Sequence, residues 1–90
     1  MSRLLLVSLD LTGPSGSYDE LFGAIKAQGT WWHYLKSTWI IDTENTPEEV
    51  VDALRPHMAG RGRMLVVPVV RPYQGLLPKA AWEWIRERIE

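Results

Sequence analysis

Asp10 is the first residue whose type and position could support chemistry. It lies within the apolar run Leu4 to Leu11, where a carboxylate is costly to bury without a partner. The more common role of such an aspartate is to hydrogen-bond the backbone of the following turn. It could instead bind a divalent cation such as Mg²⁺, which needs several oxygen ligands. The mate of Asp10 in a second copy, water or phosphate oxygens would then have to complete the site.

Aromatic residues form the most unusual feature of the chain. Three of the five tryptophans fall within nine residues, in the run Trp31, Trp32, His33, Tyr34 and then Trp39. Such residues usually fill a core or a dimer interface, but on an exposed sheet face they can stack unpaired bases. His33 could also act as a general base or a ligand, because histidine titrates near neutral pH.

Arginine residues concentrate in one glycine-spaced loop, at Arg61 and Arg63. Arginines in such loops contact phosphates, and they are equally common as solvated surface residues. We find no glycine-rich phosphate loop, no HExxH motif and no Ser-His-Asp arrangement in the sequence.

Composition indicates one small globular domain, spanning residues 1–90. Hydrophobic residues make up 46% and charged residues 23%, which excludes a disordered chain. The net charge of −1 provides no global attraction to nucleic acid or to an anionic membrane, so a polyanion site must be local. No apolar run is long enough to span a membrane, and no secretory signal is evident, so we expect a cytoplasmic protein.

Four strands and three helices are expected. Short apolar or aromatic runs predict the strands, and the hairpin turns at Leu35-Lys36-Ser37. Capping-box spacing at Ser17–Glu20 and at Thr46–Glu49 predicts the first two helices, and Pro78 opens the third. The expected strands are 4–11, 30–35, 38–43 and 64–70, and the expected helices begin near 17, 46 and 78.

This order predicts an α+β, ferredoxin-like βαββαβ fold over residues 3–70, with an antiparallel sheet, two helices on one face and an extra C-terminal helix over 78–89. The first and fourth strands are apolar at successive positions, so both faces of the sheet should be covered. The terminal helix could cover part of the second face, and a second copy could cover it fully. We therefore predict a homodimer, the commonest soluble assembly.

The segments LLLVSLDL, GTWWHYLKSTWII and LPKAAWEWI, in this order, resemble the CRISPR-associated protein two family. Its relatives include virulence-associated protein D and small orphan proteins labelled SinR-like, and the orphan branch is most similar. The resemblance implies a ferredoxin-like homodimer in which Asp10 of each subunit faces its mate and binds a divalent metal. It also implies that Ser37 matches a family serine near that site. Members are described as metal-dependent nucleases, as ribonuclease toxins or as non-catalytic scaffolds.

Two functions are therefore expected. The first is a nucleic-acid-associated dimer, acting as a weak Mg²⁺-dependent nuclease with Asp10 and Ser37 in its active site and with RNA or DNA as substrate. The second is a non-catalytic dimeric scaffold, such as an orphan defence or toxin-antitoxin component, whose aromatic hairpin and terminal helix contact an unidentified protein partner. The balanced charge favours the second.

Overall fold

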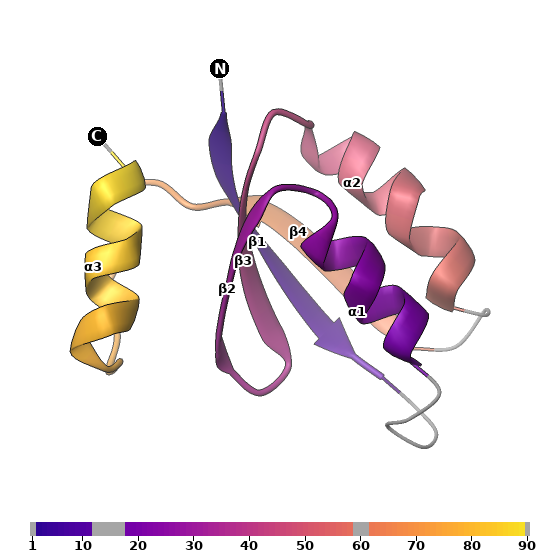
Figure 1. Cartoon of the computed structure of the whole chain (residues 1–90), viewed down its shortest axis with the longest axis horizontal. Coiled ribbons are helices and arrows are strands. Elements are labelled where there is room, and N and C mark those ends of the chain that lie inside the picture. The colour runs from indigo at the N-terminus through magenta and orange to yellow at the C-terminus, as the bar shows by residue number, and fades with distance from the viewer. Residues whose placement is uncertain (1, 12–17, 59–61, 90) are drawn as a thin grey trace.

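The structure is a computed structural model that describes residues 2–11, 18–58 and 62–89 (Figure 1). The described chain contains four strands and three α-helices, and a short 3-10 helix, η2, follows the second α-helix. In chain order they are β1 (Arg3–Asp10), α1 (Asp19–Lys26), β2 (Thr30–Leu35), β3 (Thr38–Thr43), α2 (Pro47–Leu54), η2 (Arg55–Met58), β4 (Arg63–Pro68) and α3 (Lys79–Arg88).

The four strands form one antiparallel sheet in the order β2-β3-β1-β4. Both hairpin strands have the predicted bounds, because the turn at Lys36 and Ser37 separates two runs that favour a pleated surface. β1 and β4 each begin one residue earlier than predicted, and both also end earlier. Pro68 closes β4, an edge strand, where a residue without a backbone N–H is tolerated.

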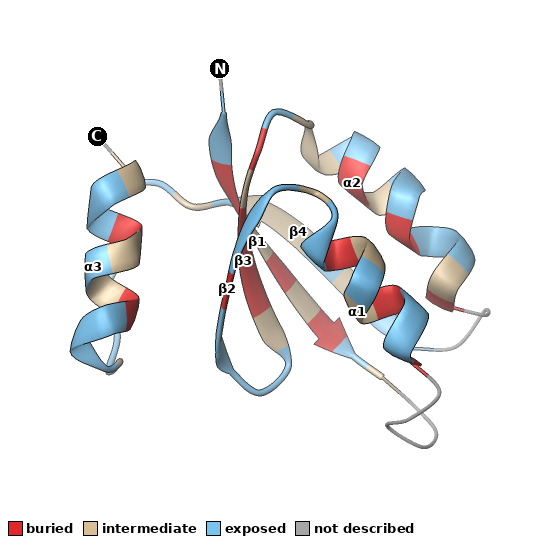
Figure 2. Cartoon of the chain, in the orientation of Figure 1, coloured by how far each residue is buried: buried red, intermediate tan, exposed pale blue. Residues whose placement is uncertain are grey.

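Helices α1 and α2 cover one face of the sheet, where most of the core lies (Figure 2). Odd-numbered residues of β1, namely Leu5, Val7 and Leu9, point to this face and are buried. Leu21 and Ile25 of α1, with Tyr18 at its N-cap, pack against them, and α2 adds Val50 and Leu54. Burial of these side chains is the main driving force for this layer.

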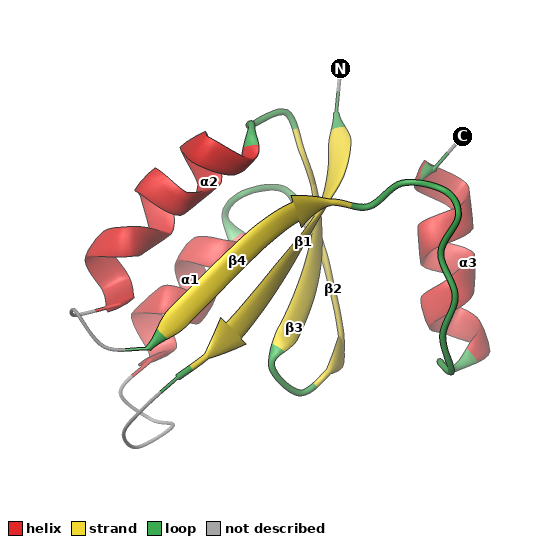
Figure 3. Ribbon diagram, turned by 180° about the vertical axis from the view of Figure 1, so that it is seen from behind, coloured by secondary structure: helices red, strands yellow, loops and turns green. Residues whose placement is uncertain are grey.

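Helix α3 lies on the opposite side of the sheet from α1 and α2 (Figure 3). Leu4, Trp32 and Ile40 form a second buried cluster with Ala81 and Ile85 of this helix. Two polar contacts hold α3 there. The indole Nε1 of Trp32 donates to the Ala81 carbonyl at 3.2 Å, and Arg88 pairs with Asp42 at 3.6 Å. The second face is therefore covered in part by the chain itself.

The helix ends differ in how well their signals predicted them. Ser17, the predicted cap of α1, lies outside the described residues, and Tyr18 occupies the N-cap without a side-chain cap hydrogen bond. Ala27 takes the C-cap of α1, two residues before Gly29. Gly29 is instead required because a Cβ there would overlap the carbonyl oxygen of Asp42. The chain can thus enter β2 close against β3.

A capping box begins α2, as predicted. The Glu49 backbone N–H donates to the Thr46 hydroxyl at 3.1 Å, and the Thr46 backbone N–H donates to the Glu49 carboxylate at 2.9 Å. The backbone hydrogen bond from Thr46 lowers the pKa of Glu49, and the Thr46 side chain adds to this effect. Pro56 lies beyond α2, within η2, since a proline in a helix interior would remove a backbone hydrogen bond.

We expect Thr46→Ala to lower the free energy of unfolding by about 1 kcal/mol, because one helix-end N–H loses its acceptor. Thr46→Ser keeps the hydroxyl and serves as the control. The pKa of Glu49 is lowered in the folded protein, so the ionised carboxylate stabilises the fold at a pH above the unfolded-state pKa of this group. This contribution is lost as the pH falls through the folded-state pKa. Urea denaturation of the three proteins at neutral and acidic pH would test this. Equal stability of the alanine variant would show that the box contributes nothing.

Candidate functional site at the end of β1

Asp10 lies at the C-terminal end of β1, with an exposed side chain. Its register partner on β4 is Arg63. Gly62 approaches the Asp10 backbone so closely that a Cβ on this glycine would lie 2.7 Å from the Asp10 carbonyl oxygen. Gly62 also has a φ of 84°, in the region that favours glycine. The position of Asp10 is thus set by backbone packing on the β4 side.

The β2–β3 turn brings two further polar residues to this end of β1. The Leu9 backbone N–H donates to the Ser37 carbonyl at 2.9 Å, which fastens the turn beside the end of the strand. Asp10, Lys36 and Ser37 consequently line one cavity of about 460 Å³. The two residues expected at an active site, Asp10 and Ser37, are therefore brought together.

Apolar and aromatic side chains complete the lining of this cavity, from Leu9, Leu11, Tyr18, Phe22 and Trp39. We call it the Trp39 cavity. Trp39 is only 3% exposed, and its indole Nε1 has no hydrogen-bond partner. The cavity thus combines a cation, an anion and a hydroxyl with a largely apolar wall.

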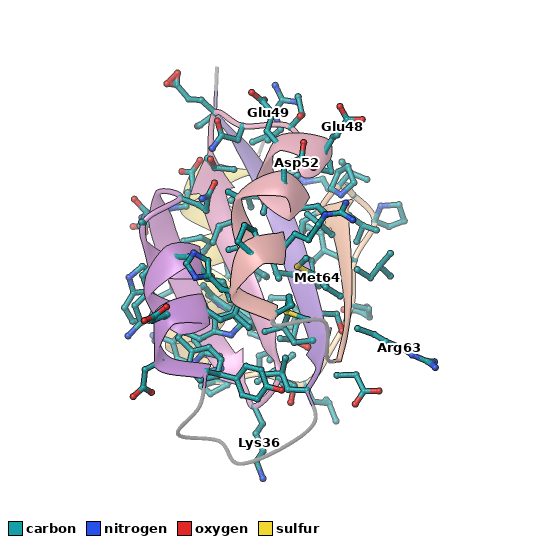
Figure 4. The ribbon with its side chains drawn as sticks, turned by 90° about the vertical axis from the view of Figure 1, so that its right-hand side faces the viewer. Lys36, Glu48, Glu49, Asp52, Arg63 and Met64 are labelled. Atoms are coloured by element: carbon teal, nitrogen blue, oxygen red, sulfur yellow. The ribbon has the colours of Figure 1, made fainter. Side chains whose placement is uncertain are left out.

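Basic side chains project at the same end of the sheet. Figure 4 shows Lys36 and Arg63 extending away from the ribbon, whereas Glu48, Glu49 and Asp52 lie at the opposite end. Both basic residues are exposed. Arg61, the other arginine expected to bind phosphate, lies outside the described residues. Among the described residues, the positive charge at this end of the sheet therefore comes from Lys36 and Arg63, beside the Asp10 carboxylate.

The described residues of one chain do not fit a Mg²⁺ site. Within the described ranges, no group of three or more histidine, aspartate and glutamate residues could hold a metal ion. Asp10 is the one carboxylate among the described residues that line the Trp39 cavity, and hard cations need several oxygen ligands. A metal site at Asp10 would have to draw its other ligands from outside this group of residues.

Two of the five expected aromatic surface residues are core residues instead. Trp32 is 1% exposed and belongs to the α3 cluster, and Trp39 belongs to the α1–α2 cluster. These two tryptophans therefore fill the core, which is the commoner role of such residues. The reason is strand alternation, since Trp31 and Trp32 point to opposite faces of the sheet and each face has its own cover.

Trp31, His33 and Tyr34 remain exposed. The Lys26 ammonium lies 4.8 Å from the centre of the Trp31 ring, a cation–π contact within the chain. The His33 ring stacks on Trp39 at 3.7 Å, and its Nε2 lies 3.1 Å from the Lys36 carbonyl oxygen. These contacts occupy His33 in supporting the turn, which carries Lys36 and Ser37.

The second face of the sheet keeps an apolar surface beyond α3. A groove of about 250 Å³ runs between the sheet and the segment 73–77, and Leu6, Leu35 and Leu76 are among its lining residues. Leu65 of β4 is 61% exposed, and the register places it opposite Ser8, on the same face as Leu6. We call Leu6, Leu35, Leu65 and Leu76 the uncovered apolar surface.

Sequence reasoning missed two members of the site. Lys36 was treated only as a turn residue, although its place between two strands could have indicated that it would lie near the end of a neighbouring strand. The unpartnered indole N–H of Trp39 had no signal in the sequence, because it depends on which groups surround the ring.

No α-helix within residues 2–11, 18–58 and 62–89 is long and apolar enough to cross a membrane. Comparisons of the chain with protein-family models, with curated proteins and with solved structures found no match.

We expect Gly62→Ala to destabilise the protein by about 1–3 kcal/mol, because alanine is strained at this φ and its Cβ would press on the Asp10 carbonyl. Gly23→Ala is a matched control. Nothing lies within 4 Å of a Cβ at Gly23, so alanine there should stabilise α1 by about 1 kcal/mol. Thermal and urea unfolding would measure both. A neutral Gly62→Ala would mean that this backbone contact does not constrain Asp10.

Proposed function

We propose that this chain is a cytoplasmic, ferredoxin-like homodimer that binds the phosphate backbone of nucleic acid at the end of β1. One observation carries the proposal: Lys36 and Ser37 line the same cavity as Asp10, although the turn and the strand end are distant in sequence. The sequence resemblance to the CRISPR-associated protein two family, through LLLVSLDL and GTWWHYLKSTWII, points in the same direction.

Phosphate recognition follows from the side chains at this end. A lysine ammonium and an arginine guanidinium form charge-assisted hydrogen bonds with phosphate oxygens, and Lys36 and Arg63 are both exposed. The Ser37 hydroxyl can donate a further hydrogen bond to the same group. Such contacts position a nucleic acid without reading its sequence, so we propose binding of RNA or DNA with little sequence preference.

Asp10 opposes this binding in a single chain, because a carboxylate repels phosphate at short range. The resemblance offers a resolution, in which two Asp10 carboxylates from two copies share a divalent cation. We derive no catalytic step from it, since the part of one chain that the structure describes does not fit such a site. Weak Mg²⁺-dependent nuclease activity stays a proposal that depends on the dimer.

The strand order β2-β3-β1-β4, with every neighbouring pair antiparallel, supports the ferredoxin-like assignment. The uncovered apolar surface supports the homodimer, because exposed contiguous apolar patches mark interaction sites. A second copy packed on this surface would extend the cover that α3 begins.

A second candidate function is a non-catalytic interaction module. The observation that favours it is the groove beside segment 73–77, where Leu76 is 99% exposed. A protein partner could insert an apolar side chain there. In this case the aromatic hairpin and α3 would support the partner surface, and the end of β1 would have no ligand.

We expect Lys36→Gln and Arg63→Gln each to weaken nucleic-acid binding several-fold and to reduce its salt dependence. The slope of log K against log salt should become shallower by about 0.7–0.9 for each phosphate that the variant no longer neutralises. Lys79→Gln is the control, because Lys79 is exposed at the start of α3. In EDTA, Asp10→Asn should bind more tightly, since it removes a negative charge. Fluorescence anisotropy with labelled single-stranded RNA, single-stranded DNA and duplex DNA would measure these changes.

The same oligonucleotides, incubated with Mg²⁺, Mn²⁺ or EDTA, test cleavage by the wild type and by Asp10→Asn. Metal-dependent cutting that the variant loses would establish a nuclease centred on Asp10. Binding without cutting would leave a scaffold that holds nucleic acid. If the wild type binds no oligonucleotide, the proposed function is wrong and the interaction module takes its place.

We expect the wild type to be a dimer at micromolar concentration and Leu65→Asp to shift it toward monomer, because a buried carboxylate on an apolar interface is costly. Leu65 is already 61% exposed, so the fold should tolerate the change. Val70→Asp is the control, since Val70 is 66% exposed but lies beyond the end of β4 and outside the uncovered apolar surface. Light scattering at several concentrations would decide, and a wild-type monomer throughout would contradict the dimer.

A further inference from the structure

The two edges of the sheet differ in how they are protected from a further strand. β2 forms one edge and β4 the other, because the strand order is β2-β3-β1-β4. The register of β2 on β3 shifts between Trp32 and Leu35, and such an irregularity hinders another strand from pairing along an edge. β4 pairs with β1 from Arg63 to Pro68 without a shift. Among the described strands, none pairs with the outer side of β4, so this edge is regular and open.

The residues of β4 are typical of a strand that has neighbours on both sides. Met64, Leu65, Val66 and Val67 are apolar in succession, a pattern found in strands that are covered on both faces. Leu65 is nevertheless 61% exposed, and the other three are only half-buried. The side chains of a further strand would pack beside those of β4 and reduce this exposure.

The hydrogen bonds between β4 and β1 show which backbone groups of β4 point outward. The Val69 backbone N–H donates to the Leu4 carbonyl at 2.9 Å. Alternate residues of an antiparallel strand direct their N–H and C=O groups to the same side, so the odd-numbered residues of β4 face β1. Met64 and Val66 therefore direct both groups outward. Pro68 directs only a carbonyl outward, because proline has no N–H.

An antiparallel copy of β4 matches these outward groups when a two-fold axis passes beside Leu65. Met64 then lies opposite Val66 of the second copy, and both such pairs exchange two hydrogen bonds. Pro68 falls opposite Gly62 of the second copy, which precedes the strand and has no side chain. A register shifted by two residues would place Pro68 opposite Met64 of the second copy, with its ring where an N–H is needed.

The same register brings apolar side chains together on the uncovered apolar surface. Leu65 lies directly opposite Leu65 of the second copy in a non-hydrogen-bonded pair, with Cα atoms about 4.5 Å apart. Arg63 lies opposite Val67 of the second copy, so no like charges face each other across the new pair of strands. The most exposed apolar side chain of β4 is thereby covered, and the Arg63 charge stays available to phosphate.

We propose that two copies of this chain pair β4 with β4 in antiparallel orientation, about a two-fold axis beside Leu65, and so join their four-stranded sheets into one. A second copy fits this edge because one register satisfies the outward groups of Met64 and Val66 and keeps Pro68 outside the pair. The inference rests on the homodimer in the proposed function and specifies the contact that builds it.

Disulfide cross-linking tests the two-fold axis directly, since the chain contains no cysteine. Leu65→Cys places two cysteines opposite each other, within the Cα separation of roughly 4.4–6.8 Å that a disulfide requires. We expect this variant to form a disulfide-linked dimer under mild oxidation, measured on non-reducing gels. Val70→Cys is the matched control, because Val70 is 66% exposed but lies about 33 Å from Val70 of the second copy in this register.

Mixtures of two variants test the register. Arg63→Cys and Val67→Cys should cross-link with each other and not with themselves, because these positions lie opposite each other only across the axis. Cross-linking of Leu65→Cys with Val67→Cys in preference to Leu65→Cys with itself would show a shift of two residues. That result would overturn the proposed register.

Amide hydrogen exchange tests the pairing without any variant. The Met64 and Val66 amides should exchange at least about tenfold more slowly in the dimer than after dilution to the monomer, because pairing protects them. The Leu65 and Val67 amides are internal controls. They face β1 and are protected in both states.

The proposals fail in different ways. A dimer without the Leu65→Cys cross-link and with rapidly exchanging Met64 and Val66 amides would overturn edge pairing and leave the homodimer, because sheets packed face to face lie about 10 Å apart. A wild-type monomer at all concentrations would overturn both. Slow exchange of these two amides in a monomer would overturn the second copy as the partner of this edge. Absence of oligonucleotide binding would contradict the phosphate proposal alone.

Discussion

The structure depends on one constraint: β1 is apolar toward both faces of the sheet. Leu5, Val7 and Leu9 face α1 and α2, while Leu4 and Leu6 face the other side. A central strand with this pattern cannot leave either face in water without loss of hydrophobic stabilisation. The chain meets the constraint fully on one side and partly on the other, where α3 covers Leu4 but leaves Leu65 and Leu76 exposed. The uncovered apolar surface is thus a consequence of the same strand that organises the core.

The polar site arises at the end of that strand for a related reason. Asp10 follows Leu9 in β1, so strand alternation points its side chain away from the α1–α2 core, and it is exposed. The β2–β3 turn is held beside the strand end by the Leu9–Ser37 backbone hydrogen bond. The aromatic hairpin supports the turn from the helix side, through the stack of His33 on Trp39. Packing and chemistry are therefore joined in one element, since the tryptophan that fills the core also lines the Trp39 cavity.

Much of the fold could be predicted from local patterns. Thr46 and Glu49 are three residues apart, and this spacing alone specifies the start of α2, because both hydrogen bonds of the box lie within one helical turn. The hairpin bounds were also predictable, since Lys36 and Ser37 interrupt two runs of aromatic and β-branched residues. The end of α1 was not, because Gly29 is required by a contact with Asp42 across the sheet rather than by a helix cap.

The sequence by itself determined which segments form strands and helices, that both faces of the sheet need cover, and that Asp10 ends a strand, because these properties depend on residue type and on short spacings. Only the tertiary structure decided the rest. It buried Trp32 and Trp39 but left Trp31 exposed, because α3 covers Trp32 on one face of the sheet while α1 and α2 cover Trp39 on the other. It also brought Lys36 and Ser37 to Asp10, since strand register is set by long-range pairing that no local spacing encodes.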